Sequence, residues 1–215
     1  MGKLRFTMTM SLDGYVAGPG QSVENPLGQG GLALHEWAFA TKSFRAVHGL
    51  EGGESGLDDD RVAAWNSNIG ATIMGRNMFG PVRGPWGDNA WVGWWGDDPP
   101  FHTPVFVLSH HEREPLAMQG GTTFYFVADG IETALERAAE AANGRDVAIG
   151  GGASTAQQYL LARLVDEMEI HVVPLLLGAG TRLFEDLEGG PAGYECAGLV
   201  SSPAAAHYTY VRQNA

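Results

Sequence analysis

The chain has little cysteine and little positive charge. Its 215 residues include one cysteine, Cys196, which excludes an internal disulfide and any metal site that needs several thiolates. The 13 lysines and arginines stand against 25 aspartates and glutamates, which gives a formal net charge of −12. Nucleic acids and anionic membranes bind basic surfaces, so this charge argues against both as partners.

Long hydrophobic runs are also absent from the sequence. No apolar run approaches the length needed to span a membrane, although 44% of the residues are hydrophobic. Residues 3–10 alternate polar and apolar side chains, as in a half-buried strand, instead of forming the apolar core of a signal peptide. We therefore expect a soluble cytoplasmic protein in which residues 1–215 form a single domain.

Strand and helix patterns alternate along the rest of the chain. Fully apolar runs in its middle are typical of strands buried on both faces, whereas residues 167–172 and 206–212 fit antiparallel strands at an edge. This pattern predicts an α/β fold with a mostly parallel central sheet, helices on both faces and an antiparallel C-terminal edge. One helix is predicted at 131–142, opened by a capping box from Asp129 to Glu132. Two stretches lack either pattern: a Gly- and Glu-rich segment at 49–57, expected to be a mobile loop, and a Trp-rich insertion at 81–103.

Two short sequence segments that contain glycine lie where a predicted buried strand is followed by a helix, so backbone without side chains is exposed there. They are Gly75-Arg76-Asn77 and Gly150-Gly151-Gly152. Unpaired N–H groups at a helix N-terminus favour an anion, and the guanidinium of Arg76 adds a positive fork suited to phosphate. Two such sites indicate a ligand with separated phosphates, such as a dinucleotide. By itself the glycine triplet is more often only a turn, since its third glycine comes too early for the GxGxxG fingerprint.

Other candidate residues have competing structural interpretations. The four tryptophans between Trp86 and Trp95 fit a lid, a dimer surface or a small additional core. The string His110-His111-Glu112 does not have the spacing of a metal site, because adjacent strand residues point to opposite faces. We therefore expect no bound metal.

Five short motifs are spread over nearly the whole chain. They are Ser11-Leu12-Asp13-Gly14-Tyr15-Val16-Ala17-Gly18, Ile73-Met74-Gly75-Arg76-Asn77-Met78-Phe79, Val105-Phe106-Val107-Leu108-Ser109, Ile149-Gly150-Gly151-Gly152-Ala153-Ser154 and Pro174-Leu175-Leu176-Leu177-Gly178-Ala179-Gly180-Thr181-Arg182-Leu183-Phe184. In this order they resemble the dihydrofolate-reductase-like superfamily, and most closely the reductase domain of riboflavin-biosynthesis deaminase-reductases and its stand-alone bacterial relatives. The resemblance implies a dihydrofolate-reductase-like three-layer fold.

The same resemblance implies NADPH as the cofactor. Under it, the Gly75 string meets the pyrophosphate and adenosine side, the triplet cradles the pyrophosphate, and Arg76 and Ser109 reach the 2′-phosphate. The residues carried over as cofactor-binding are Val16, Ala17, Gly75, Arg76, Asn77, Leu108, Ser109, His110, Gly150, Gly151, Gly152, Ala153, Ser154 and Thr155.

Hydride transfer also needs a proton, or a carboxylate that orients the ring. Asp13 in the first turn and Glu36 on the first helix fall in matching places and are the catalytic candidates, with Trp37 and Phe79 as substrate-binding candidates. The alternatives are that Asp13 only bonds its own turn, that Glu36 is solvated and that Trp37 is a core residue.

The expected function is that of an NADPH-dependent reductase. It would transfer hydride to a C=N or C=O bond of a pteridine-like or related heterocyclic small molecule. A non-catalytic nucleotide-binding protein and a 5-amino-6-(5-phosphoribosylamino)uracil reductase stay open as alternatives. Because relatives of this kind are usually dimeric, we also expect a homodimer.

Overall fold

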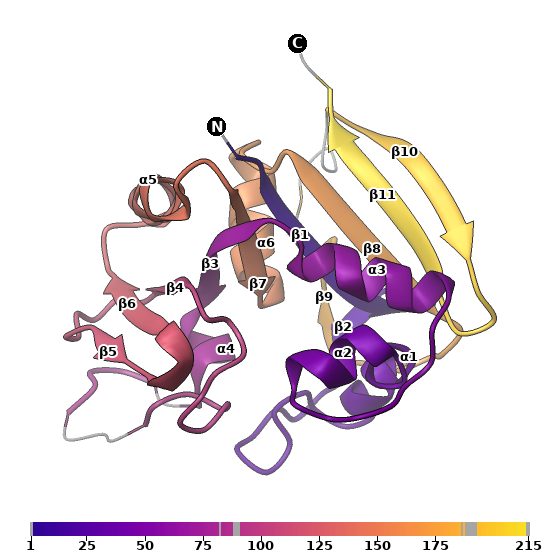
Figure 1. Cartoon of the computed structure of the whole chain (residues 1–215), viewed down its shortest axis with the longest axis horizontal. Coiled ribbons are helices and arrows are strands. Elements are labelled where there is room, and N and C mark those ends of the chain that lie inside the picture. The colour runs from indigo at the N-terminus through magenta and orange to yellow at the C-terminus, as the bar shows by residue number, and fades with distance from the viewer. Residues whose placement is uncertain (1, 82, 88–90, 186, 188–192, 214–215) are drawn as a thin grey trace. The chain divides into compact units, whose positions relative to one another are not determined.

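The computed structural model describes residues 2–81, 83–87, 91–185, 187 and 193–213 (Figure 1). The chain divides into two compact units. The first consists of residues 1–6 and 68–165, and the second of residues 7–67 and 166–215. Residues 82 and 88–90 of the predicted Trp-rich insertion lie outside the described residues.

The first unit is built on a mostly parallel sheet. Its strands are β1 (Leu4–Ser11, of which residues 4–6 belong here), β3 (Ile69–Gly75), β4 (Pro104–Leu108), β5 (Leu116–Ala117), β6 (Thr123–Val127) and β7 (Asp146–Gly151). Their order is β1-β7-β3-β4-β6-β5, and every pairing is parallel except that of β5 with β6. The helical segments are α4 (Arg76–Phe79), η2 (Gln119–Gly121), α5 (Ile131–Ala142) and α6 (Ala153–Leu161).

Helices cover both faces of this sheet. Arg137 of α5 stands over the ring of Phe106 in β4, with 5.6 Å between Cζ and the ring centroid. Val105 and Val107, the neighbours of Phe106, belong instead to a buried cluster with Phe79 of α4. Because neighbouring strand residues point to opposite faces, α5 and α4 lie on opposite sides of β4. The prediction of a mostly parallel sheet with helices on both faces is confirmed here.

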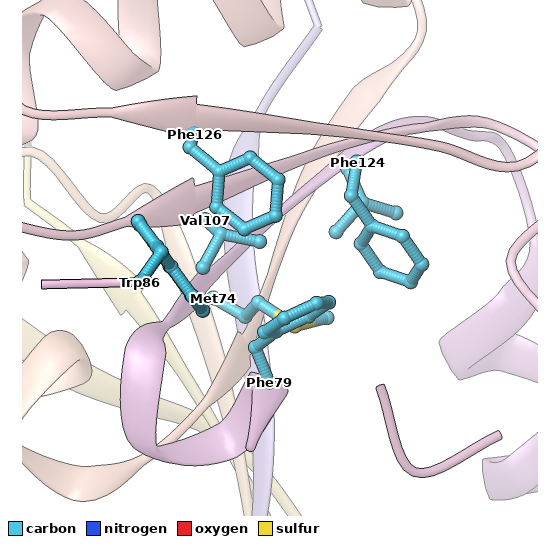
Figure 2. Close-up of a cluster of buried hydrophobic side chains, with 7 residues drawn as sticks. Met74, Phe79, Trp86, Val107, Phe124 and Phe126 are labelled. Atoms are coloured by element: carbon cyan, nitrogen blue, oxygen red, sulfur yellow. The ribbon is translucent and has the colours of Figure 1, made fainter. Parts of the chain in front are cut away.

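The Trp-rich segment packs onto the α4 side of this sheet as an additional core. Trp86 is 8% exposed and lies edge-on to Phe79 and Phe126, and Figure 2 shows these side chains gathered beside α4. Trp91 and Trp95 are partly buried against the same cluster, and the indole N–H of Trp91 donates to the Phe79 carbonyl at 2.9 Å. Of the three alternatives for these tryptophans, the described contacts favour packing.

The second unit joins short helices to strands that include an antiparallel C-terminal edge. Its strands include the rest of β1, β8 (Glu167–Val173), β10 (Tyr194–Ser201) and β11 (Ala206–Arg212), in the order β10-β11-β8-β1, and separately β2 (Tyr15–Ala17) pairs with β9 (Thr181–Arg182). Strands β10 and β11, and β11 and β8, are antiparallel, so the predicted antiparallel C-terminal edge is confirmed. The helices are η1 (Gly31–His35), α1 (Glu36–Phe39), α2 (Lys42–Val47) and α3 (Leu57–Asn66).

Residues 49–57, predicted to be a mobile loop, are irregular up to Leu57, where α3 begins. The N–H of Glu54 donates to the Ala40 carbonyl at 2.8 Å, and the Glu54 carbonyl accepts from the N–H of Lys42 at 2.9 Å. These two bonds tie the middle of the segment to the residues around Thr41. Its mobility stays a prediction.

Candidate functional site

Three neighbouring strands of the first unit end side by side. The register pairs Met74 of β3 with Gly151 of β7, and Gly75 of β3 with Leu108 of β4. Because these strands are parallel, their carboxyl ends meet at one edge of the sheet, which is where open α/β sheets bind ligands. The fold thus brings together the two glycine strings and the segment after β4, which lie far apart in the sequence.

The two glycine strings are in direct contact. A β-carbon on Gly75 would lie 2.4 Å from the hydroxyl oxygen of Thr155, a residue of α6 that is 3% exposed. A side chain at position 75 would displace at least this hydroxyl group. Glycine at position 75 therefore leaves room for the first turn of α6 beside the end of β3.

The glycine triplet leads into a helix whose N-terminus has no side-chain cap. Gly152 is the N-cap of α6, and it offers its first N–H groups no side-chain acceptor. Gly151 has a φ of 120°, which favours glycine, and its peptide bond to Gly152 is cis. A β-carbon on Gly152 would meet nothing within 4 Å, so the space beside this residue is open. An anion can approach the backbone here as the sequence predicts.

Arg76 and Ser109 are joined at the same edge. Nη1 of Arg76 donates to the hydroxyl oxygen of Ser109 at 3.3 Å. Ser109 is 9% exposed, and its hydroxyl donates to the His111 carbonyl at 2.9 Å and accepts from the His111 N–H at 3.1 Å. The hydroxyl hydrogen of Ser109 is therefore already used in the bond to His111. Of Arg76 and Ser109, Arg76 is the better placed to donate to a ligand.

Positive charge is concentrated around Arg76. Its guanidinium carbon lies 3.5 Å from the centre of the Trp86 ring, and that of Arg113 lies 4.9 Å from the same ring. Burial lowers the pKa of Arg76, and repulsion by Arg83 and Arg113 lowers it further. In a chain with a net charge of −12, this group of arginines is a local exception that favours an anion. The sequence predicted neither the contact of Trp86 with Arg76 nor any role for Arg113, because both residues come from irregular segments with no periodic signal.

The remaining cofactor candidates divide between the units. Asn77, His110, Gly150 and Ser154 are exposed, Leu108 is half-buried, and Ala153 is buried at the start of α6; these residues lie on or beside the edge formed by β7, β3 and β4. Val16 and Ala17 lie on β2 in the second unit, where Ala17 pairs with Thr181.

Asp13 is held as an anion within the second unit. Its carboxylate accepts from the hydroxyl of Ser11 at 2.6 Å and from the backbone N–H groups of Leu177 and Gly178 at 3.1 and 2.7 Å. The Ser11 bond is the main cause that lowers the pKa of Asp13 to about 2, and the two backbone bonds contribute. A carboxyl group with this pKa is ionised near neutral pH, so it orders the 177–178 turn and is poorly suited to donate a proton.

The other three candidates differ in exposure. Glu36 is exposed on the first turn of α1 and is open to solvent. Trp37 is 6% exposed, donates its indole N–H to the Thr9 hydroxyl at 3.2 Å and belongs to a buried cluster. Phe79 is completely buried in the first unit. The burial of both rings indicates packing roles.

The described residues hold neither a cluster of metal ligands nor a helix that could span a membrane. No three His, Cys, Asp or Glu side chains within the described ranges gather as metal ligands would. Among the same residues, no helix has the length and apolar character required to cross a membrane.

Comparisons with known proteins point in one direction. A family model for the RibD C-terminal domain matches residues 2–196. A solved structure of a protein assigned to riboflavin biosynthesis, from Shewanella sp. PV-4, is 23% identical, with 99% of each chain covered and a TM-score of 0.59. No curated protein sequence matches the chain.

Two further solved structures share the fold. Dihydrofolate reductase from Enterococcus faecalis, solved with NADP(H), is 14% identical, with 99% of this chain and 98% of that chain covered and a TM-score of 0.51. RibD from Acinetobacter baumannii is 16% identical with a TM-score of 0.57, and this chain covers 59% of its length. The predicted dihydrofolate-reductase-like fold is confirmed.

Proposed function

Because the chain belongs to the RibD C-terminal domain family, we propose that it is an NADPH-dependent reductase of a small heterocyclic molecule. The proposed reaction is hydride transfer to a C=N or C=O bond of a pteridine-like or related ring. One observation supports it above all: the ends of β7, β3 and β4 bring an uncapped helix N-terminus and the Arg76–Ser109 pair to one sheet edge.

The residues at this edge fit a phosphate-bearing dinucleotide. The open space beside Gly152 and the N-terminus of α6 suit the pyrophosphate. Arg76, in a field strengthened by Arg83 and Arg113, suits the 2′-phosphate that distinguishes NADPH from NADH. When bound, the cofactor supplies the hydride, and the chain supplies binding and orientation.

The two carboxylate candidates receive different roles in this proposal. Asp13 fixes the turn at Leu177 and Gly178 as a permanent anion. Glu36 is the exposed carboxylate, so it is the one proposed to deliver a proton, directly or through water. Val16 and Ala17 are proposed to border the nicotinamide, and the exposed Asn77 and His110 to lie beside the adenosine portion.

Two alternatives to this proposed function stay open. A riboflavin-type pyrimidine reductase, acting on 5-amino-6-(5-phosphoribosylamino)uracil, is favoured by the family match. A nucleotide-binding protein without turnover is the other, since a fold does not by itself establish activity.

The test is NADPH oxidation by the purified protein across a panel of pterins, pyrimidine precursors of flavins and small carbonyl compounds. We expect turnover with at least one ring compound, and a lower rate with NADH in place of NADPH. NADPH binding without oxidation in any mixture would favour the non-catalytic alternative. Failure to bind NADPH would contradict the proposal altogether.

We also propose that the protein is a homodimer in the cytoplasm. Several large apolar side chains of the second unit are exposed, among them Leu176 at 68% and Leu199 on β10 at 55%. Exposed apolar side chains favour burial against a partner when they lie together. Sedimentation at micromolar concentration should give twice the chain mass of 22.9 kDa, and a monomer would contradict the proposal.

A further inference from the structure

Two residues, Trp86 and Ser109, hold the guanidinium of Arg76, and both donate a hydrogen bond to the same carbonyl group, that of His111. Its guanidinium stacks on the Trp86 ring at 3.5 Å, and its Nη1 donates to the Ser109 hydroxyl at 3.3 Å. The indole N–H of Trp86 donates to the His111 carbonyl at 3.0 Å, and the Ser109 hydroxyl donates to the same carbonyl at 2.9 Å. The four residues therefore form a closed ring of contacts that fixes the orientation of the guanidinium.

The two anchors use different parts of the guanidinium. Stacking occupies the flat face of the group, whereas its five N–H donors point outward in the plane. A guanidinium held by its face has its N–H donors fixed in one plane, and a planar fork of donors is what arginine uses to recognise a phosphate. A lysine at this position would have neither the flat face nor the fork.

The Trp86 ring is packed within the buried cluster of the first unit. The ring is 8% exposed and is packed edge-on against Phe79 and Phe126, with centroid distances of 5.9 and 4.9 Å. Arg113 also lies over this ring, at 4.9 Å, and donates to the Trp91 carbonyl at 2.9 Å. The tryptophan thus connects the buried core of the first unit to the charged groups at the sheet edge.

We propose that Trp86 is a positioning residue for cofactor selectivity: it holds Arg76 in the orientation that recognises the 2′-phosphate of NADPH. The inference rests on the proposed function, because it assumes that the Arg76 site takes this phosphate. It assigns to the Trp-rich insertion a role in choosing NADPH over NADH. It also assigns to Ser109 the role of a second anchor for Arg76, since its hydroxyl hydrogen is bonded to His111.

Two small probes separate this role from general binding. Adenosine 2′,5′-bisphosphate carries the phosphate in question, and AMP lacks it. The ratio of their dissociation constants, measured by isothermal titration calorimetry, reports recognition of the 2′-phosphate alone and needs no turnover. We expect the unchanged protein to prefer the bisphosphate.

Substitutions at Trp86 should change this ratio. Trp86→Leu removes the ring, and we expect the preference to fall by about two- to thirtyfold, the range for a cation–π contact between exposed and desolvated sites, while AMP binding stays the same. Trp86→Phe keeps an aromatic face and should retain most of the preference. Trp95→Leu is the matched control, because Trp95 packs against Phe101 and Phe124 in the same cluster, and its ratio should not change.

A double variant and a lysine variant complete the test. If Trp86 acts through Arg76, Trp86→Leu should have no further effect on the ratio in an Arg76→Ala background. Arg76→Lys keeps the charge on a half-buried side chain and does not disturb the core, so it tests the stacked geometry even if Trp86→Leu fails to fold. We expect Arg76→Lys to lose the preference as well.

The outcomes are distinguishable. An unchanged ratio in Trp86→Leu, equal weakening of both probes, or a full preference in Arg76→Lys would overturn the role of Trp86 and leave the proposed reductase function standing. Binding of neither probe by the unchanged protein, together with no binding of NADPH, would overturn both proposals.

Discussion

The glycines where β7 meets α6 differ in what a side chain would meet. Gly151 has a φ of 120°, so any substitution there strains the backbone whether or not a ligand binds. Gly152 has a φ of −81° and open space around its α-carbon. A substitution at position 152 can therefore separate ligand approach from folding, which one at position 151 cannot.

Gly152→Ala should fold normally and bind NADPH more weakly, because the added methyl group occupies the space proposed for the pyrophosphate. Titration of both forms with NADPH, beside thermal unfolding curves, checks this. Gly198→Ala on β10 is the matched control, since its β-carbon would sit 4.0 Å from that of Thr209, an ordinary contact. Unchanged NADPH affinity in Gly152→Ala would mean that the triplet is only a turn.

Asp13 and Glu36 should respond differently to removal of their charge. Asp13→Asn replaces one acceptor oxygen by an NH₂ group facing backbone donors, so we expect a lower thermal midpoint and slower turnover. Because the pKa of Asp13 is about 2, the change should remove no ionisation near neutral pH from the rate profile. Glu36→Gln should leave the thermal midpoint unchanged and lower kcat.

Measurement of kcat against pH, with the substrate found in the panel, distinguishes the two carboxylates. Loss of a near-neutral ionisation in Asp13→Asn, with Glu36→Gln silent, would move the proton-delivering role to the turn. Full activity in both variants would mean that water alone supplies the proton.

At the scale of elements, a buried chain of hydrogen bonds links β1, β8, β11 and α3. Trp65 donates its indole N–H to Nε2 of His171 at 3.0 Å, so this nitrogen is the acceptor and Nδ1 carries the hydrogen. Nδ1 of His171 lies 2.6 Å from Nδ1 of His207, whose Nε2 lies 2.8 Å from the carboxylate of Asp58. Thr7 of β1 completes the chain through its hydroxyl, 2.6 Å from Nε2 of His171. Both imidazoles are therefore neutral and oriented.

This chain predicts loss of stability in mild acid. Burial is the main cause that lowers the pKa of His171 from 6.5 to about 2, and repulsion by His207 and Arg61 adds to it; burial also lowers the pKa of His207. The unfolded chain then takes up protons first, so the stabilisation is complete above pH 6.5 and is lost as the pH falls below it. For His171 alone the loss should be about 2 kcal/mol by about pH 5.

Urea unfolding at several pH values checks the prediction. His171→Gln should flatten the dependence of the unfolding free energy on pH between about pH 7 and about pH 5, although the variant is less stable overall. His48→Gln, on the exposed C-terminal side of α2, should keep the slope of the unchanged protein. Equal slopes in all three proteins would contradict the assignment.

Elements with a strong periodic signal were predictable, and their contacts less so. The helix expected at 131–142 is α5, but the expected capping box is wrong: the N-cap is Gly130, and no side chain caps it. A glycine there, with a φ of 94°, lets the chain turn into the helix without the Asp129 side chain. The tryptophans of the insertion were visible in the sequence, whereas their packing on β4 and β6 depends on contacts distant in the chain.

At the scale of the whole molecule, the mostly parallel sheet, its antiparallel C-terminal edge and the dihydrofolate-reductase-like fold followed from pattern and resemblance. What the sequence could not provide was the set of contacts around each candidate. The bonds that Asp13 accepts from Leu177 and Gly178 join residues remote in sequence, and so does the bond from Trp37 to Thr9. The stack of Arg76 on Trp86 joins nearer residues, but across an irregular segment without periodicity. Side-chain periodicity does not encode such contacts. The fold class could therefore be predicted from the sequence, whereas the role of each residue could be proposed only from the structure.

Equilibrium titration with NADPH and NADH, for the unchanged protein and for Arg76→Ala, tests the central claim most directly. We predict that NADPH binds more tightly than NADH to the unchanged protein. Arg76→Ala should weaken NADPH by about 1.5–3 kcal/mol, the range for a hydrogen bond to a charged group, and NADH much less. Equal affinities for the two cofactors in the unchanged protein, or an equal loss of both in Arg76→Ala, would contradict the account.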